Sequence, residues 1–187
     1  MKNILKSKKG LSTVVTTLII LVVSVLLATV VTFYAINITT NRTQQESLYM
    51  SNLHVWYNTT GNWAEAAFVL TNTGGKDVVL QSITARSQPS DWSNVYSYSD
   101  NTITYNSLSP TIVQPSSASI TVTYNGNLTQ SLTQASGVIT LRSGYTLVVY
   151  INHPDSVGQN DVGTPVSVTA FTANAQWTQE VNVQAAQ

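Results

Sequence analysis

The pattern of hydrophobic and polar positions changes once along this chain, near residue 50. Residues 11–36 (LSTVVTTLIILVVSVLLATVVTFYAI) form one uncharged, mostly aliphatic run, whereas the remainder alternates short apolar stretches with polar residues. The first pattern favours a helix that is apolar on all sides, and the second favours short β-strands. We therefore expect one long helix followed by a separate β-rich region.

The apolar run is long enough to cross a membrane. Its most apolar part, residues 14–36, would measure roughly 35 Å as a helix, against about 30 Å for a hydrocarbon core. A cleaved secretory signal fits poorly, because its apolar core is shorter and ends at an A-x-A-like site. The positive-inside rule places the lysines before the run in the cytoplasm and the β-rich region outside.

The junction before the run, Lys8-Lys9-Gly10-Leu11-Ser12-Thr13, resembles the processing site of class III signal peptides in archaeal type IV pilins and archaellins. In that family a membrane peptidase cuts after the small residue, so the hydrophobic helix stays in the mature protein. The resemblance covers residues 6–36 and implies a cut between Gly10 and Leu11, with Lys8 and Lys9 matching the basic positions. It divides the chain into a leader (1–10), an assembly helix with its extension (11–50) and an extracellular domain (51–187).

One position departs from the bacterial members of the wider group. Many bacterial pilins carry a glutamate as the fifth mature residue, and here that position is Val15. Together with the Thr-rich start of the helix, this favours an archaeal-type subunit. Residues 37–50 are expected to extend the helix outward, although Asn and Thr are poor helix formers.

Small residues gather on one side of the expected helix. At 100° per residue, about a third of the circumference holds Thr13, Thr17, Ser24, Ala28, Thr32 and Ala35. Small residues let helices approach closely, and their hydroxyls can bond across to a neighbour or back to their own helix. The stripe is interpreted as a packing face; the alternative is a chance scatter, since Ser12, Thr16 and Thr29 lie elsewhere.

Beyond residue 52 the period is that of strands. Residues 66–85 predict a strand, a Gly74-Gly75 turn and a second strand, and further strands are expected at 96–105, 119–124, 137–141, 146–151, 166–173 and 177–183. Short strands at this spacing predict a β-sandwich. The segment around Asn72-Thr73-Gly74 is similar to the immunoglobulin-like domains of archaeal pilins, so the fold class expected is α+β, a long hydrophobic helix followed by an immunoglobulin-like sandwich.

Charge and composition narrow the function. The chain has eight basic and eight acidic residues, and removal of Lys2, Lys6, Lys8 and Lys9 with the leader leaves 4 − 8 = −4. No basic patch then remains for nucleic acid. The absence of cysteine excludes disulfides and thiolate metal sites.

No constellation of catalytic residues is found, so we expect neither an enzyme nor a cofactor or metal site. The chain has two histidines and no phosphate-binding, nucleophile-elbow or dinucleotide motif. The sequon N-x-[ST] occurs at Asn37, Asn41, Asn58 and Asn127, about as often as chance predicts. Asn58 and Asn127 are the better candidates for a glycan, because the other two lie near the helix.

These features favour a structural subunit of an archaeal surface filament that polymerises through its helix for adhesion. Its expected partners are copies of itself, the membrane before assembly, a prepilin peptidase, an assembly ATPase and a platform protein. A subunit of the archaellum, a minor pilin or a pseudopilin are alternatives within this class. A single-pass surface-binding protein with an uncleaved anchor is the alternative from another class.

Overall fold

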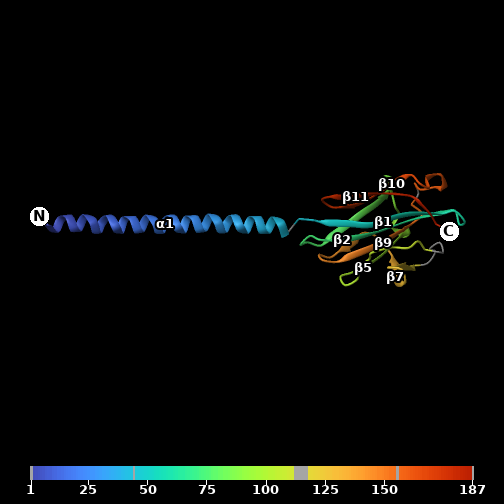
Figure 1. Cartoon of the computed structure of the whole chain (residues 1–187), viewed down its shortest axis with the longest axis horizontal. Coiled ribbons are helices and arrows are strands. Elements are labelled where there is room, and N and C mark those ends of the chain that lie inside the picture. Colours follow the sequence, from blue (N-terminus) through green and yellow to red (C-terminus); the bar gives the residue numbers. More distant parts are fainter. Residues whose placement is uncertain (1, 44, 112–117, 155, 187) are drawn as a thin grey trace. The chain divides into compact units, whose positions relative to one another are not determined.

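The structure is a computed structural model of the whole chain, and it describes residues 2–43, 45–111, 118–154 and 156–186, with the backbone alone at 2–9 and 42–43. The chain divides into two compact units on either side of the Thr43–Gln44 bond. The first unit is a helix and the second is built from β-strands (Figure 1).

Helix α1 runs from Lys2 to Thr43 without a break. The segment contains no proline and one glycine, Gly10, so nothing in it interrupts the backbone ladder. Several of its Ser and Thr hydroxyls donate to carbonyls of the preceding turn, as in Ser24 Oγ to the Ile20 carbonyl (2.6 Å) and Thr29 Oγ1 to the Val25 carbonyl (2.8 Å). These bonds satisfy polar side chains within the helix itself.

Helix α1 begins and ends at other residues than the sequence predicted. It includes the expected leader, and it ends seven positions before residue 50, because Leu48 already pairs with Asn72 in the first strand. The expected extension of the helix to residue 50 is therefore wrong for its last residues. Strand pairing and the poor helix propensity of the Asn- and Thr-rich segment after Ile38 both favour the earlier end.

Seven strands form sheet A. In spatial order they are β12 (Gln184–Ala186), β1 (Leu48–Asn58), β2 (Trp63–Asn72), β9 (Thr146–Asn152), β5 (Val95–Asp100), β7 (Leu128–Gln134) and β6 (Ser119–Tyr124). Neighbours are antiparallel except β12 and β1, which run parallel. The strands β2 and β9 lie at the centre and are buried on both faces.

Sheet B contains β11 (Gln176–Asn182), β10 (Pro165–Thr172), β3 (Val78–Ala85) and β4 (Gln88–Pro89), and β8 (Ile139–Leu141) pairs with the other side of β3. Two short 3₁₀ turns, η1 (Trp92–Asn94) and η2 (Gln159–Asp161), lie in the connections. In β10 every second residue is buried, the pattern of a strand with one face on a core.

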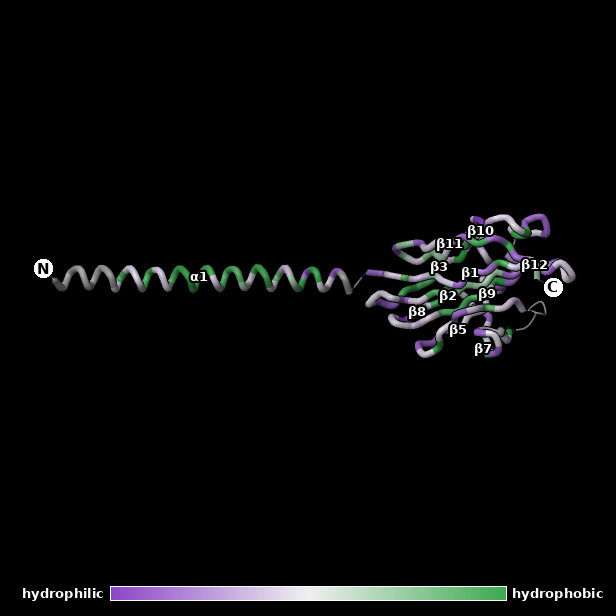
Figure 2. The backbone as a smooth tube through the Cα atoms, viewed as in Figure 1, coloured by the Kyte–Doolittle hydropathy of each residue, from purple (hydrophilic) through white to green (hydrophobic). Residues whose placement is uncertain are grey.

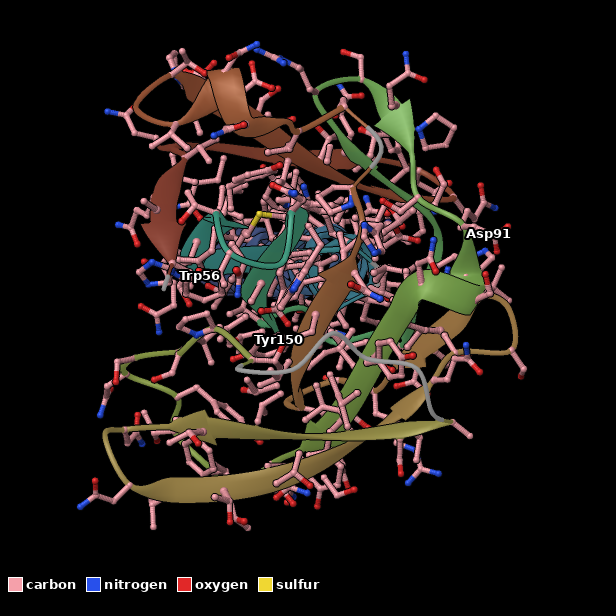
Figure 3. The ribbon with its side chains drawn as sticks, turned by 90° about the vertical axis from the view of Figure 1, so that its right-hand side faces the viewer. Trp56, Asp91 and Tyr150 are labelled. Carbon is pink, nitrogen blue, oxygen red and sulfur yellow. The ribbon has the colours of Figure 1, made fainter. Side chains whose placement is uncertain are left out.

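Two hydrophobic clusters lie on opposite faces of sheet A. The first fills the space between the sheets and includes Phe68, Leu80 and Ile151. The second includes Trp56 and Tyr150, together with apolar side chains of β6 and β7. In Figure 3 the strands of sheet B lie above the central strands, and β6 and β7 lie below them. Sheet A therefore has a core on each side.

The expected fold class, α+β with a β-sandwich after the helix, is confirmed. All the expected strands are present, most of them with shifted ends, whereas β1, β4, β7 and β12 lie outside the expected strand ranges. The strands in 66–85 do not form a hairpin, because β2 belongs to sheet A and β3 to sheet B. Asn72 redirects the chain: its Oδ1 accepts the Gly74 amide (3.0 Å), and its Nδ2 donates to the carbonyls of Lys76 (2.8 Å) and Leu141 (3.1 Å).

Candidate functional site

The most prominent functional feature is the apolar surface of α1. Within it, Gly10–Asn41 is long and apolar enough to cross a membrane, and all the side chains there are exposed within the single chain. Large aliphatic residues range from Ile38, 43% exposed, to Leu11, 70% exposed. The hydrophobic colouring of this stretch is clear in Figure 2. A helix that is apolar on all sides requires cover by lipid or by other helices.

The predicted processing junction lies inside α1. Lys8, Lys9, Gly10 and Leu11 all have helical backbone. A Cβ added at Gly10 would meet no atom within 4 Å, and glycine in a helix interior costs about 1 kcal/mol relative to alanine. The fold of the chain therefore gives no reason for glycine at this position, although a peptidase that needs a small residue would.

A shallow groove on α1 includes two residues of the small-residue stripe, Ala28 and Thr32, and also Thr29, which lies off the stripe. The groove is lined by Val25, Ala28, Thr29, Thr32, Phe33 and Ile36. Within the stripe, Thr17 Oγ1 donates to the Val14 carbonyl (2.9 Å) and Thr32 Oγ1 donates to the Ala28 carbonyl (2.7 Å). Because these hydroxyls are satisfied internally, the stripe presents small and largely apolar groups to a neighbour. The role of the whole stripe, with Thr13, Ser24 and Ala35, as a packing face stays a prediction.

The four sequons lie in different surroundings. Asn37 and Asn41 are on α1, and the Asn37 amide donates to the Phe33 carbonyl (2.9 Å). Asn58 ends β1 and is buried; its Oδ1 accepts the amides of Thr60 (3.0 Å) and Gly61 (2.7 Å). Asn127 is exposed in the turn between β6 and β7. The structure therefore favours Asn127 over Asn58 for modification.

Glu65 was not expected from the sequence to be a special residue. It lies in β2 with 1% of its surface exposed, and it accepts two bonds from Thr111, from the amide to Oε2 and from Oγ1 to Oε1, each 2.8 Å. Burial raises the pKa of Glu65 from 4.5 to about 7, and the Thr111 bonds oppose that rise. The signal in the sequence was one acid in the apolar run WAEAAFVL.

Tyr150, on the same face of sheet A as Glu65, also binds the segment 109–111. The Tyr150 hydroxyl donates to the Ser109 carbonyl (2.9 Å), and burial raises the pKa of Tyr150 above its ordinary value. Glu65 and Tyr150 thus hold residues 109–111 against sheet A. Across the part of the chain that the structure describes, no group of three His, Asp or Glu side chains could hold a metal ion.

Comparisons with known proteins leave the family open. No protein-family model and no curated protein matches this chain.

Proposed function

We propose that this chain is a structural subunit of an archaeal type IV pilus-like surface filament. The precursor sits in the cell membrane through α1 and is cut between Gly10 and Leu11. The mature subunits then polymerise with their helices packed together, and the β-regions are displayed at the cell surface for adhesion. The prepilin peptidase, assembly ATPase and platform protein are its partners during this process.

One observation carries the proposal: a helix that is apolar on all sides follows directly on Lys8-Lys9-Gly10-Leu11. A simple anchor explains the hydrophobicity but not the junction. A Cβ at position 10 would pack against none of the described side chains, so the presence of glycine supports recognition by a peptidase. Assembly of helices in a filament core supplies the cover that such a surface requires once it leaves the lipid.

Adhesion is favoured over motility within this class. Archaellins resemble this chain in the junction but often carry more glycine and an early glutamate in the helix, and LSTVVTTLII has neither. The competing class is a single-pass surface-binding protein with an uncleaved anchor. It predicts a mature chain that keeps residues 1–10.

The mature N-terminus is the decisive measurement. Intact-mass analysis or N-terminal sequencing of protein from the native cell surface is expected to give a chain that begins at Leu11. Gly10→Asp should leave a membrane-bound precursor and no filaments, because a charged side chain replaces the small residue before the cut. Gly10→Ala is the matched control, since it keeps a small residue and is expected to be processed.

A mature chain that begins at Met1 would refute the cleavage and favour the simple anchor. Normal filaments from the Gly10→Asp variant would refute the assigned junction. The space around Gly10 makes this pair of variants informative, because a Cβ there meets none of the described side chains within 4 Å.

A further inference from the structure

A groove of about 290 Å³ lies on the outer face of sheet A, bounded on one side by the segment that follows β5. Its lining is uncharged and comes from β1, β2, β9 and residues 103–106. All of these residues belong to the β-region, so the groove does not depend on helix packing or filament assembly. The volume is near the lower end for ligand pockets, about 300–1,000 Å³.

Three neighbouring strands build the floor of the groove. Tyr49 of β1 is opposite Thr71 of β2, which is in turn opposite Thr146 of β9. The hydroxyls of Thr71 and Thr146 are 3.2 Å apart. The Tyr49 side chain remains 63% exposed although it is large and aromatic. The floor therefore presents an accessible aromatic ring beside a pair of hydroxyl groups.

The wall of the groove begins at an irregularity in β1. The β1–β2 register shifts between Ser51 and His54, and Asn52 has φ of 50°, a left-handed conformation that Asn tolerates better than most residues. The Asn52 side-chain amide donates to the Tyr105 carbonyl and fastens the segment after β5 to this strand. The buried Tyr105 hydroxyl has no hydrogen-bond partner among the described residues.

The rim of the groove is held in place before any ligand arrives. Asn125 Oδ1 accepts the Asn106 amide (2.7 Å), and Asn125 Nδ2 donates to the Thr104 carbonyl (2.7 Å). Asp100 Oδ1 accepts the Ile103 amide (3.0 Å) at the other end of the same segment. A rim fixed in this way loses little conformational entropy on binding, which favours affinity in a small site.

We infer that this groove binds a neutral sugar. Beside the aliphatic Val69 and Ile103, its side chains are hydroxyls, carboxamides and two tyrosines, which match a ligand that carries many hydroxyl groups. The lack of charge in the lining disfavours anionic and cationic ligands, and the polar floor disfavours a wholly apolar one. The exposed ring of Tyr49 offers a flat surface for the apolar face of a pyranose ring. The small volume limits the ligand to one or two rings.

Binding is tested on the full chain in a zwitterionic detergent, because glycoside detergents would compete for the groove. The probes are glucose, galactose, mannose, N-acetylglucosamine, maltose and cellobiose, measured by saturation-transfer NMR. At least one is expected to bind with Kd of about 0.1–10 mM, a range suited to a small site. Tyr49→Ala should weaken that binding at least about tenfold, which corresponds to about 1.4 kcal/mol, while Tyr49→Phe retains it.

Asn106→Ala tests the rim, with Asn101→Ala as the matched control because Asn101 is exposed in the same segment but lies outside the groove. The first should weaken binding several-fold and the second should leave it unchanged; thermal melting verifies that each variant is folded. Absence of binding for all six sugars up to about 50 mM would overturn the inference. Binding that survives both Tyr49→Ala and Asn106→Ala would overturn it too, since the ligand would then occupy another site.

Discussion

Burial governs the chemistry of Glu65. The carboxyl group lies on the outer face of sheet A and is held by Thr111. Burial first, and the charge of Glu65 second, raise the pKa of the neighbouring Tyr150 hydroxyl. The ionised form of Glu65 is disfavoured because the loss of water around the charge exceeds the gain from two hydrogen bonds. The neutral acid keeps both contacts, since its own O–H can donate to the Thr111 hydroxyl.

The β-region is therefore expected to be more stable in mild acid than in mild base. The pKa of Glu65 is about 7 in the folded chain against 4.5 for the free group. Its contribution to the free energy of unfolding is therefore complete below pH 4.5 and is lost as the pH rises to about 7. The whole change corresponds to roughly 3 kcal/mol. Glu65→Gln should remove most of this dependence between pH 5 and pH 8, measured by urea unfolding at each pH.

The matched control is Glu180→Gln, because Glu180 is exposed in β11. Glu180→Gln should leave the pH dependence of the free energy of unfolding the same as in the unchanged protein. Hydrogen bonds lower the pKa values of three aspartates, Asp91, Asp100 and Asp161. Their contributions to stability are therefore lost only below the window from pH 5 to pH 8. Equal slopes for the unchanged protein and Glu65→Gln would contradict the assigned role of burial.

The two better sequons are expected to behave differently. The Asn58 side chain accepts two turn amides and is 9% exposed, so a glycan there would require the turn to open. Asn127 meets no such constraint. Intact mass of native protein should lose a glycan in Asn127→Gln, whereas Asn58→Gln should keep the glycan and lower the melting temperature by a few degrees. A glycan lost in Asn58→Gln alone would reverse this assignment.

At the scale of the elements, one glycine fixes the connection between the sheets. Gly74 follows β2, and its amide donates to the Ser47 carbonyl (3.0 Å) just before β1. A Cβ at position 74 would lie 2.8 Å from the Gln45 carbonyl oxygen and 2.9 Å from the Ser47 amide nitrogen. These are backbone atoms, which cannot rotate away as a side chain would.

Gly74→Ala should therefore lower the free energy of unfolding by about 1–3 kcal/mol, measured by urea unfolding of the full chain. Gly158→Ala is the control, because its Cβ would lie 3.8 Å from Asp161 Oδ2, an ordinary contact, and its φ is −122°. Similar stability losses in both variants would mean that the close approach at Gly74 is not the cause.

At the scale of the whole molecule, the proposed filament depends on which face of α1 meets its neighbours. Thr16 and Thr17 are matched positions for a test of this face. Both hydroxyls donate to carbonyls of their own helix, those of Ser12 and Val14, at 2.9 Å each. At 100° per residue Thr17 falls on the small-residue stripe and Thr16 falls off it. The two positions differ mainly in the direction in which the side chain points.

Thr17→Leu is expected to reduce the yield of filaments, counted by electron microscopy, at least about tenfold if close helix approach contributes the usual 1–2 kcal/mol per contact. Thr16→Leu should assemble normally. Both substitutions raise the hydrophobicity of the helix equally, so membrane insertion of the precursor is the same in both. Equal yields from the two variants would show that the stripe is a chance scatter.

The sequence by itself determined the helix and the β-class of the remainder. Both follow from local patterns: an uncharged run of the required length, and a period of two bounded by turn residues. The proposed junction at Gly10 is likewise a local pattern, because a peptidase would read adjacent residues. Strand positions were predicted closely at 119–124 and 146–151, where β6 and β9 lie, since their alternation and their flanking turns agree.

Only the tertiary structure decided how distant segments meet. The strands β2 and β3 flank a turn signal, yet they joined different sheets because Asn72 bonds to Lys76 and Leu141 rather than closing a hairpin. Glu65 acquired its raised pKa from burial that no local pattern reports, and the hydrogen bonds that oppose the rise come from Thr111, 46 positions away. The groove beside Tyr49 likewise depends on pairing of β1, β2 and β9. Long-range pairing and burial are properties of the packed chain, so they could not be deduced from the sequence one segment at a time.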